Sequence, residues 1–120
     1  MPKKTLVLGA SGNPARYSNL AIQRLRSYGH PVVAIGKKQT SVGDVEIGME
    51  RTVWKDIDTV TVYLNPVNQV QYQDYLLSLR PKRIIFNPGA ENEELAAAAN
   101  AQGIQVLEAC TLVLLSTGQY

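Results

Sequence analysis

Short apolar runs alternate with helix-like segments along most of this chain of 120 residues. The apolar runs cover residues 5–8, 32–35, 59–64, 83–86 and 104–107, and the helix-like segments cover residues 18–28, 67–79 and roughly 91–102. Strands separated by helices are joined by right-handed crossovers, which place parallel strands between two layers of helices. The sequence therefore predicts a Rossmann-like α/β fold, a doubly wound parallel sheet of about five strands with three-layer α/β/α architecture. We expect one domain over residues 1–120.

The first predicted helix has a definable start and end. Ser18 is predicted as its N-cap, because a serine hydroxyl accepts a hydrogen bond from the first helical turn. Tyr17 would pack on Ile22 as a hydrophobic staple, and Gly29 would end the helix. Residues 39–55 are the least regular part of the chain, and the alternating residues 45–47 are interpreted as a short strand or a flap.

A glycine-rich turn joins the first predicted strand to this helix, with the sequence LGASGNPARYS over residues 8–18. Gly9 and Gly12 can adopt positive φ and let a ligand approach the backbone, and the helix that follows directs its positive dipole end at the same place. Ser11 and Pro14 stand where the dinucleotide pattern G-x-G-x-x-G requires glycine. The turn therefore predicts a phosphate-binding loop that matches an NAD loop poorly.

Charge is distributed unevenly, although the net charge is only +2. No Asp or Glu precedes Asp44, whereas seven Lys or Arg residues do. Lys37 and Lys38 follow the second predicted strand, where an NAD-binding protein would carry an acidic residue for the ribose. They favour a ribose phosphate, as in NADP or coenzyme A, unless they are only solvated loop residues. Arg16 lies in the glycine-rich turn, and the other early cations are interpreted as solvated surface: Lys3, Lys4, Arg24 and Arg26.

The rest of the composition excludes several classes of function. One cysteine and one histidine allow no internal disulfide framework and make a structural zinc site unlikely, so we predict no metal. The chain has neither an apolar run long enough to span a membrane nor the apolar region of a signal peptide, which predicts a cytoplasmic protein. Basic residues are not interleaved with aromatic residues, so we expect no nucleic-acid partner.

No catalytic set can be assembled from these residues. His30, the single histidine, precedes the second strand and is expected at the surface on the opposite edge from the glycine-rich turn. Cys110 could be a reactive thiol, although a small buried residue is the simpler interpretation. Glu108 is a lone carboxylate at a strand end. We therefore predict no catalytic residues.

Four segments carry a family resemblance. They are residues 7–18, residues 29–35, the pair Asn65-Pro66, and a last segment that starts with residues 92–95 and ends with residues 102–110. The first segment has Ser11, Pro14, Arg16 and Ser18 at characteristic spacing. In these segments the chain resembles the small stand-alone coenzyme A-binding proteins, which are similar to the N-terminal domain of the succinyl-CoA synthetase alpha subunit. The synthetases also use a phosphorylated histidine on a second domain, which has no counterpart in this chain.

The resemblance implies a role for each turn. The diphosphate of coenzyme A would be held by backbone N–H groups, by Ser11 and by Arg16 as a charged clamp, within the set Gly9, Ala10, Ser11, Gly12, Asn13, Pro14, Arg16 and Ser18. The adenosine would be flanked by Gly36, Lys37 and Lys38, where the family tends to carry a Val-Asn-Pro-like turn. The ligand path would be lined by Asn65, Pro66 and Val67, with Pro88 and Gly89 near the pantetheine arm. Cys110 would lie near the coenzyme thiol.

The leading hypothesis is a non-catalytic single-domain module that binds coenzyme A or a short acyl-CoA as its small-molecule ligand. One alternative is an NADP-binding oxidoreductase fragment or redox-sensing domain. Another is an interaction protein that kept the fold and lost the ligand. The glycine-rich turn with Ser11 and Arg16 favours ligand binding over that last alternative.

Overall fold

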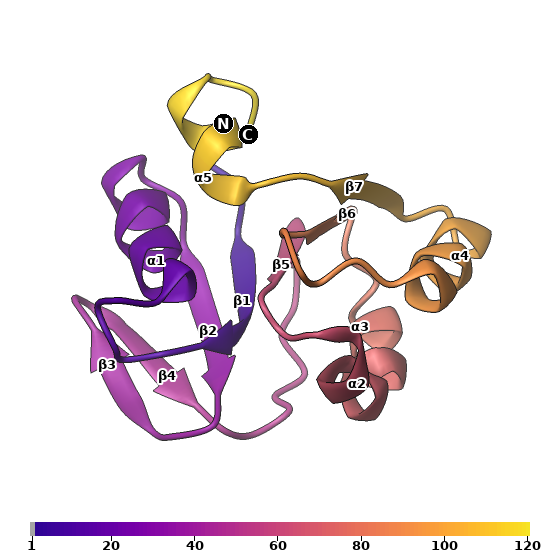
Figure 1. Ribbon diagram of the computed structural model, residues 1–120, viewed down its shortest axis with the longest axis horizontal. Helices are drawn as coiled ribbons and strands as arrows, with labels where there is room; N and C mark the ends of the chain where they lie inside the picture. Colours follow the sequence, from indigo (N-terminus) through magenta and orange to yellow (C-terminus); the bar gives the residue numbers. More distant parts are fainter. Residues whose placement is uncertain (1) are drawn as a thin grey trace.

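A computed structural model describes residues 2–120 and contains a seven-stranded sheet with helices on both faces (Figure 1). The strands are β1 (Thr5–Ala10), β2 (Val32–Gly36), β3 (Thr40–Val42), β4 (Val45–Gly48), β5 (Thr59–Val62), β6 (Arg83–Phe86) and β7 (Gln105–Glu108). The helices are α1 (Tyr17–Ser27), α2 (Pro66–Gln69), α3 (Gln73–Leu79), α4 (Glu93–Ala101) and α5 (Thr111–Ser116), with a 3-10 turn η1 (Val70–Tyr72) between α2 and α3. The prediction of a doubly wound α/β fold is confirmed.

The strand order is β3-β4-β2-β1-β5-β6-β7. Every neighbouring pair is parallel except β3 and β4, which are antiparallel. From β1 the chain moves to β2 on one side, and it later returns to β5 on the other side of β1. The winding direction therefore reverses at β1, and ligands of open α/β sheets bind at the carboxyl ends of the strands beside such a reversal.

The sheet separates two apolar cores. Helices α1 and α5 pack on one face, where Val7 of β1 meets Ile22 and Leu115. Helices α2, α3 and α4 lie over the other face, where Leu8 of β1 joins a cluster that includes Leu76. Strands β5 and β6 are buried along their whole length, as is typical of central strands of a parallel sheet covered on both faces. Within residues 2–120, no helix combines the length and the apolar character needed to cross a membrane.

Several details differ from the sequence prediction. The irregular segment forms the β3–β4 hairpin, which adds two strands beyond β2 and makes the sheet wider than the predicted five. The helix expected over residues 67–79 is divided into α2, η1 and α3. Helix α5 was not expected at all. The hairpin and α5 lie at a sheet edge and at the end of the described chain, where short elements are decided by what they pack against rather than by their own propensity.

The start of α1 also differs. Arg16 is the N-cap and makes no side-chain capping hydrogen bond, whereas Ser18 is buried inside the first turn at 4% exposure. The predicted Ser18 cap is therefore wrong. The staple is wrong as well, because Tyr17 is 75% exposed and does not cover Ile22. The helix ends at Ser27 with Tyr28 as its C-cap, and Gly29 follows as expected, with a φ of 84° that suits glycine.

Candidate functional site

The loop between β1 and α1 is held in shape by its own side chains. The Ser11 hydroxyl accepts from the Asn13 amide N–H at 3.0 Å, and Asn13 Oδ1 accepts from the Ala15 N–H at 3.0 Å. Asn19, buried in the first turns of α1, donates to the Ser11 carbonyl at 3.0 Å. Residues 12–17 are exposed. The loop therefore presents backbone and the Arg16 side chain to solvent from a fixed conformation.

The end of β2 approaches this loop closely. Ala10 is the register partner of Gly36, and a Cβ atom on Gly36 would lie 2.2 Å from the Ala10 carbonyl oxygen. Gly9 has a φ of 88°, and a Cβ there would lie 3.1 Å from the Leu64 side chain. Both positions require glycine because neighbouring chain occupies the space of a side chain. The β1–α1 loop, the β2 end and the β5–α2 turn are thus brought together.

The turn after β5 begins α2 with a strong cap. Asn65 Oδ1 accepts from the Asn68 N–H at 2.9 Å, and Pro66 occupies the first helical position. Val67 is 81% exposed. Asn65, Pro66 and Val67 therefore lie on the open side of the carboxyl edge, and their contact with a ligand stays a prediction.

The turn after β6 is built on a buried asparagine. Asn87 donates to the Thr61 hydroxyl at 2.7 Å and to the Val62 carbonyl at 2.9 Å, and its Oδ1 accepts from the Thr111 N–H at 2.9 Å. Pro88 and Gly89 follow it and are exposed. Asn87 thus fixes the exposed Pro88-Gly89 turn against the ends of β5 and α5.

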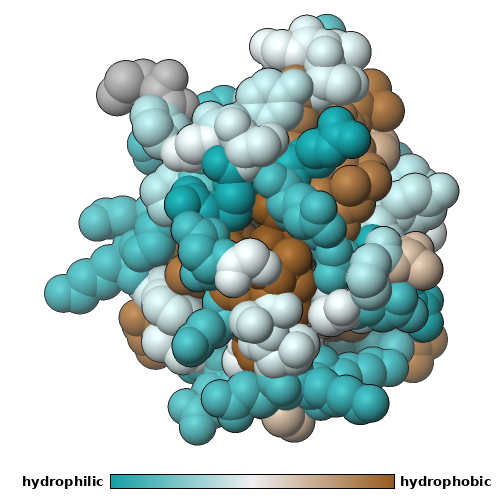
Figure 2. Space-filling model, turned by 90° about the vertical axis from the view of Figure 1, so that its left-hand side faces the viewer, coloured by the Kyte–Doolittle hydropathy of each residue, from teal (hydrophilic) through white to brown (hydrophobic). Residues whose placement is uncertain are grey.

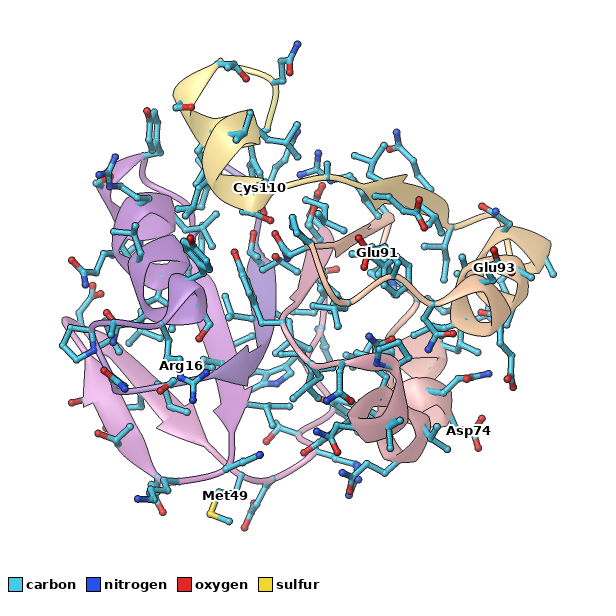
Figure 3. All side chains as sticks on the ribbon, in the orientation of Figure 1. Arg16, Met49, Asp74, Glu91, Glu93 and Cys110 are labelled. Atoms are coloured by element: carbon cyan, nitrogen blue, oxygen red, sulfur yellow. The ribbon has the colours of Figure 1, made fainter. Side chains whose placement is uncertain are left out.

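Cys110 lies beyond β7, as the N-cap of α5, and is a half-buried free thiol. In Figure 3 it is well separated from Arg16, which lies by the start of α1. Tyr63, which follows β5, packs against the core cluster that contains Leu115 of α5, and burial raises its pKa to about 12, so this phenol stays protonated at neutral pH. Its buried hydroxyl lacks a well-formed hydrogen bond. Glu108, the last residue of β7, is exposed.

Three cations at the carboxyl edge are exposed and have no carboxylate partner. Arg16, Lys37 and Lys38 form no ion pair within residues 2–120, whereas Arg26 pairs with Asp44 at 2.7 Å. The Arg26 contact holds the pKa of the Asp44 carboxyl below its ordinary value. Arg26 is therefore a structural cation rather than simple solvated surface, and the three edge cations remain available to an external anion.

A groove of about 570 Å³ starts next to this edge and extends over β2 and β4. Its walls include Gly48, Met49 and Trp54, and Gln39 of its lining directly follows Lys38. Figure 2 shows the side of the molecule on which β3, β4 and α1 lie, where hydrophilic side chains surround an apolar centre. The groove offers a partly apolar surface beside the two lysines.

Residues 3–116 match the protein family described as the CoA binding domain. The chain belongs to this family. No curated protein matches the chain significantly. The match covers every turn of the carboxyl edge described above, so the family assignment and the geometry concern the same part of the molecule.

Solved structures agree with this assignment of fold. A crystal structure of an uncharacterized protein is 48% identical, with a TM-score of 0.97, and the match covers 100% of this chain and 99% of that chain. A protein from Thermus thermophilus is 22% identical with a TM-score of 0.85, covering 99% and 91% of the two chains. A hypothetical protein from Pyrococcus horikoshii OT3 is also 22% identical, with a TM-score of 0.86 and coverage of 97% and 83%. At 22% identity, the structures from Thermus thermophilus and Pyrococcus horikoshii establish only that the fold is shared.

Sequence reasoning missed the residues that hold the loops in place. Asn19, Gln69 and Asn87 are buried amides that bind loop backbone, and none was proposed as part of the site. Asn87 had a usable signal, since it directly follows a predicted central strand. Gln69 had none, because a glutamine in a helix is usually exposed.

Proposed function

We propose that this CoA binding domain binds coenzyme A or a short acyl-CoA and holds it without changing it chemically. The observation that carries the proposal is the set of unpaired cations Arg16, Lys37 and Lys38 at the carboxyl edge. Coenzyme A presents a diphosphate and a 3′-phosphate, so it matches an edge with cations on two adjacent turns. Hydrogen bonds between arginine and phosphate are about twice as strong as neutral ones.

The close packing at Gly9 and Gly36 supports this placement, because it brings the β1–α1 loop, the β2 end and the β5–α2 turn together at one edge, where loop N–H groups can meet a phosphate. The diphosphate would contact residues 9–13 and Arg16. The 3′-phosphate would contact Lys37 and Lys38, with the adenosine toward the groove over β2 and β4. Ser18, being buried, would support the loop rather than touch the ligand.

The pantetheine arm would cross the turns after β5 and β6. Val67, with its exposed apolar side chain, and the Pro88-Gly89 turn would line its path toward Cys110. Thr111, the neighbour of Cys110, shares a hydrogen bond with Thr61 of β5 at 2.8 Å, so an arm that reaches Cys110 would end close to β5.

Chemistry on the thioester is not expected. His30 lies before β2, at the amino edge, whereas Cys110 and Glu108 lie at the carboxyl edge. No thiol–imidazole pair can form between them, and activation of a thiol nucleophile needs such a base or a lowered pKa. Incubation with acetyl-CoA should therefore release no free thiol above background. Thiol release that disappears in Cys110→Ala or Glu108→Gln would make this protein an enzyme.

A thermal-shift panel tests the ligand. Coenzyme A at one hundred times its Kd should stabilise the protein by about 2.7 kcal/mol, which raises Tm measurably. Dephospho-CoA should raise Tm less, because it lacks the phosphate proposed to meet Lys37 and Lys38. Equal shifts with the two ligands would remove the lysines from the site. A shift with NADP alone, and none with coenzyme A or acetyl-CoA, would overturn the proposal.

A further inference from the structure

Gln69 is a fully buried side chain that ends the short helix α2. Its Nε2 group donates to the Leu64 carbonyl at 2.7 Å and to the Ala90 carbonyl at 2.7 Å. Its Oε1 atom accepts from Asn92 Nδ2 at 2.9 Å. Both amide protons and the amide oxygen of Gln69 are thus used, so the side chain is completely hydrogen-bonded inside the protein.

The partners of Gln69 belong to different turns of the carboxyl edge. Leu64 immediately precedes Asn65 and Pro66, while Ala90 immediately follows Gly89. Asn92 is the N-cap of α4 and accepts from the Leu95 N–H at 3.0 Å. One side chain therefore connects the β5–α2 turn, the β6–α4 turn and the start of α4.

The backbone joins the two turns at their strand ends, where the Asn87 N–H donates to the Val62 carbonyl at 3.4 Å, and Gln69 joins them further along, between Leu64 and Ala90. Helix α2 has four residues and continues as a 3-10 turn, so the β5–α2 turn has no long helix to fix its position. The exposed Val67 stands two residues before the buried Gln69, and the exposed Pro88-Gly89 pair directly precedes its partner Ala90. An apolar residue at position 69 would leave the Leu64 and Ala90 carbonyls without their donor, at a cost for each buried group.

We infer that Gln69 is a positioning residue for the pantetheine half of the ligand. It sets the separation of the two exposed turns and does not touch the ligand itself. The inference rests on the proposed function, since it concerns the part of coenzyme A that would cross these turns. It predicts that changes in the Gln69 network weaken binding of the pantetheine half and spare the nucleotide half.

The test compares two ligands by calorimetry on folded protein. Coenzyme A has both halves, whereas adenosine 3′,5′-bisphosphate has only the nucleotide half. In Gln69→Leu the Kd for coenzyme A should rise on the order of tenfold, because two loop carbonyls lose a hydrogen bond and the turns shift. The Kd for adenosine 3′,5′-bisphosphate should stay within about twofold of the wild-type value.

Two further variants guard against a simple loss of folding. Asn92→Asp keeps an acceptor for the Leu95 N–H and loses the donor to Gln69, so it should reproduce the selective effect in a milder form. Gln71→Leu changes an exposed glutamine in η1 and should leave both Kd values unchanged. Circular dichroism at the temperature of the titration establishes that each variant is folded.

The outcomes separate this inference from the proposed function. Wild-type protein that binds coenzyme A no tighter than adenosine 3′,5′-bisphosphate would overturn the inference and leave nucleotide binding intact. Equal weakening of both ligands in Gln69→Leu and Asn92→Asp, or no weakening of either, would also overturn it. Wild-type protein that binds neither ligand would refute the proposed function, and the inference with it.

Discussion

The two edges of the sheet use cations in opposite ways. At the amino edge, Arg83 is only 7% exposed, donates to Thr59 and to the Tyr120 carbonyl, each at 2.9 Å, and stacks 4.5 Å from the Tyr120 ring centroid. Lys3 donates to the same carbonyl. At the carboxyl edge, Arg16 and the Lys37-Lys38 pair are exposed and make no ion pair within residues 2–120.

This contrast separates stability from binding. Arg83 and Lys3 at the amino edge meet carbonyl, hydroxyl and aromatic groups that come from distant parts of the chain, so these two cations contribute to folding. The carboxyl-edge cations have no internal partner, so they add little to folding and keep their charge for a ligand. Lys3, interpreted from the sequence as solvated surface, belongs to the first group.

The largest expected effect is a loss of stability, and it comes from a substitution at the carboxyl edge. Gly36→Ala places a methyl group 2.2 Å from the Ala10 carbonyl oxygen. The strands must move apart, and we expect a loss of about 3 kcal/mol in the free energy of unfolding. Urea denaturation measures it. Gly48→Ala is the matched control, because its Cβ would meet no atom within 4 Å and its stability should change by less than about 0.5 kcal/mol.

Arg16→Ala tests the free cations. It should weaken coenzyme A binding by about 1.5–3 kcal/mol, the range of a hydrogen bond to a charged group. The free energy of unfolding should change by less than about 0.5 kcal/mol, because the side chain has no internal partner. Arg24→Ala, on the exposed face of the same helix, should change neither quantity. Unchanged affinity in Arg16→Ala by calorimetry would remove Arg16 from the site.

Arg83→Ala should show the reverse behaviour. The change removes two hydrogen bonds and a cation–π contact, and we expect a loss of about 2 kcal/mol in the free energy of unfolding. Affinity for coenzyme A should be unchanged in protein that remains folded. The neighbouring exposed Lys82→Ala provides the control for charge. A variant with lost affinity and wild-type stability would contradict the division between the two edges.

The smallest expected effect is a pH dependence at the amino edge. Burial, then the charges of Lys3 and Arg83, lower the pKa of His30 below its ordinary 6.5, while Asp58 opposes them. The Arg26 guanidinium also contacts His30, because it donates to the His30 backbone carbonyl. His30 Nδ1 also accepts from the Lys3 N–H at 2.9 Å, a bond that protonation at this nitrogen would break.

The unfolded chain therefore binds this proton more readily than the folded protein. Stability from neutral His30 is complete above the unfolded pKa and is lost as the pH falls through 6.5 toward the lower folded pKa. Urea midpoints at about pH 7.5 and about pH 5 measure the loss. His30→Gln should show a smaller difference between the two midpoints. An equal difference in both proteins would exclude His30 as the cause.

Much of the fold follows from local patterns. The runs at residues 32–35 and 83–86 match β2 and β6 closely, because apolar segments bounded by glycine or proline have few other structures available. Parallel order follows from the helices between strands, and it brings the predicted turns to one edge. The predicted site residues therefore lie at the carboxyl edge or beside it, while their contact with coenzyme A remains a prediction.

The tertiary structure decided the rest, because the deciding partners lie far apart in the sequence. Gln69 meets Ala90 and Asn92 from positions 21 and 23 residues away, and Arg83 meets Tyr120 from 37 residues away. A residue type specifies which hydrogen bonds a side chain can make, but only packing specifies whether a partner is present. The sequence by itself determined the alternating fold and the residue types at its carboxyl edge, and the packed structure decided which cations are used internally and which remain free for a ligand.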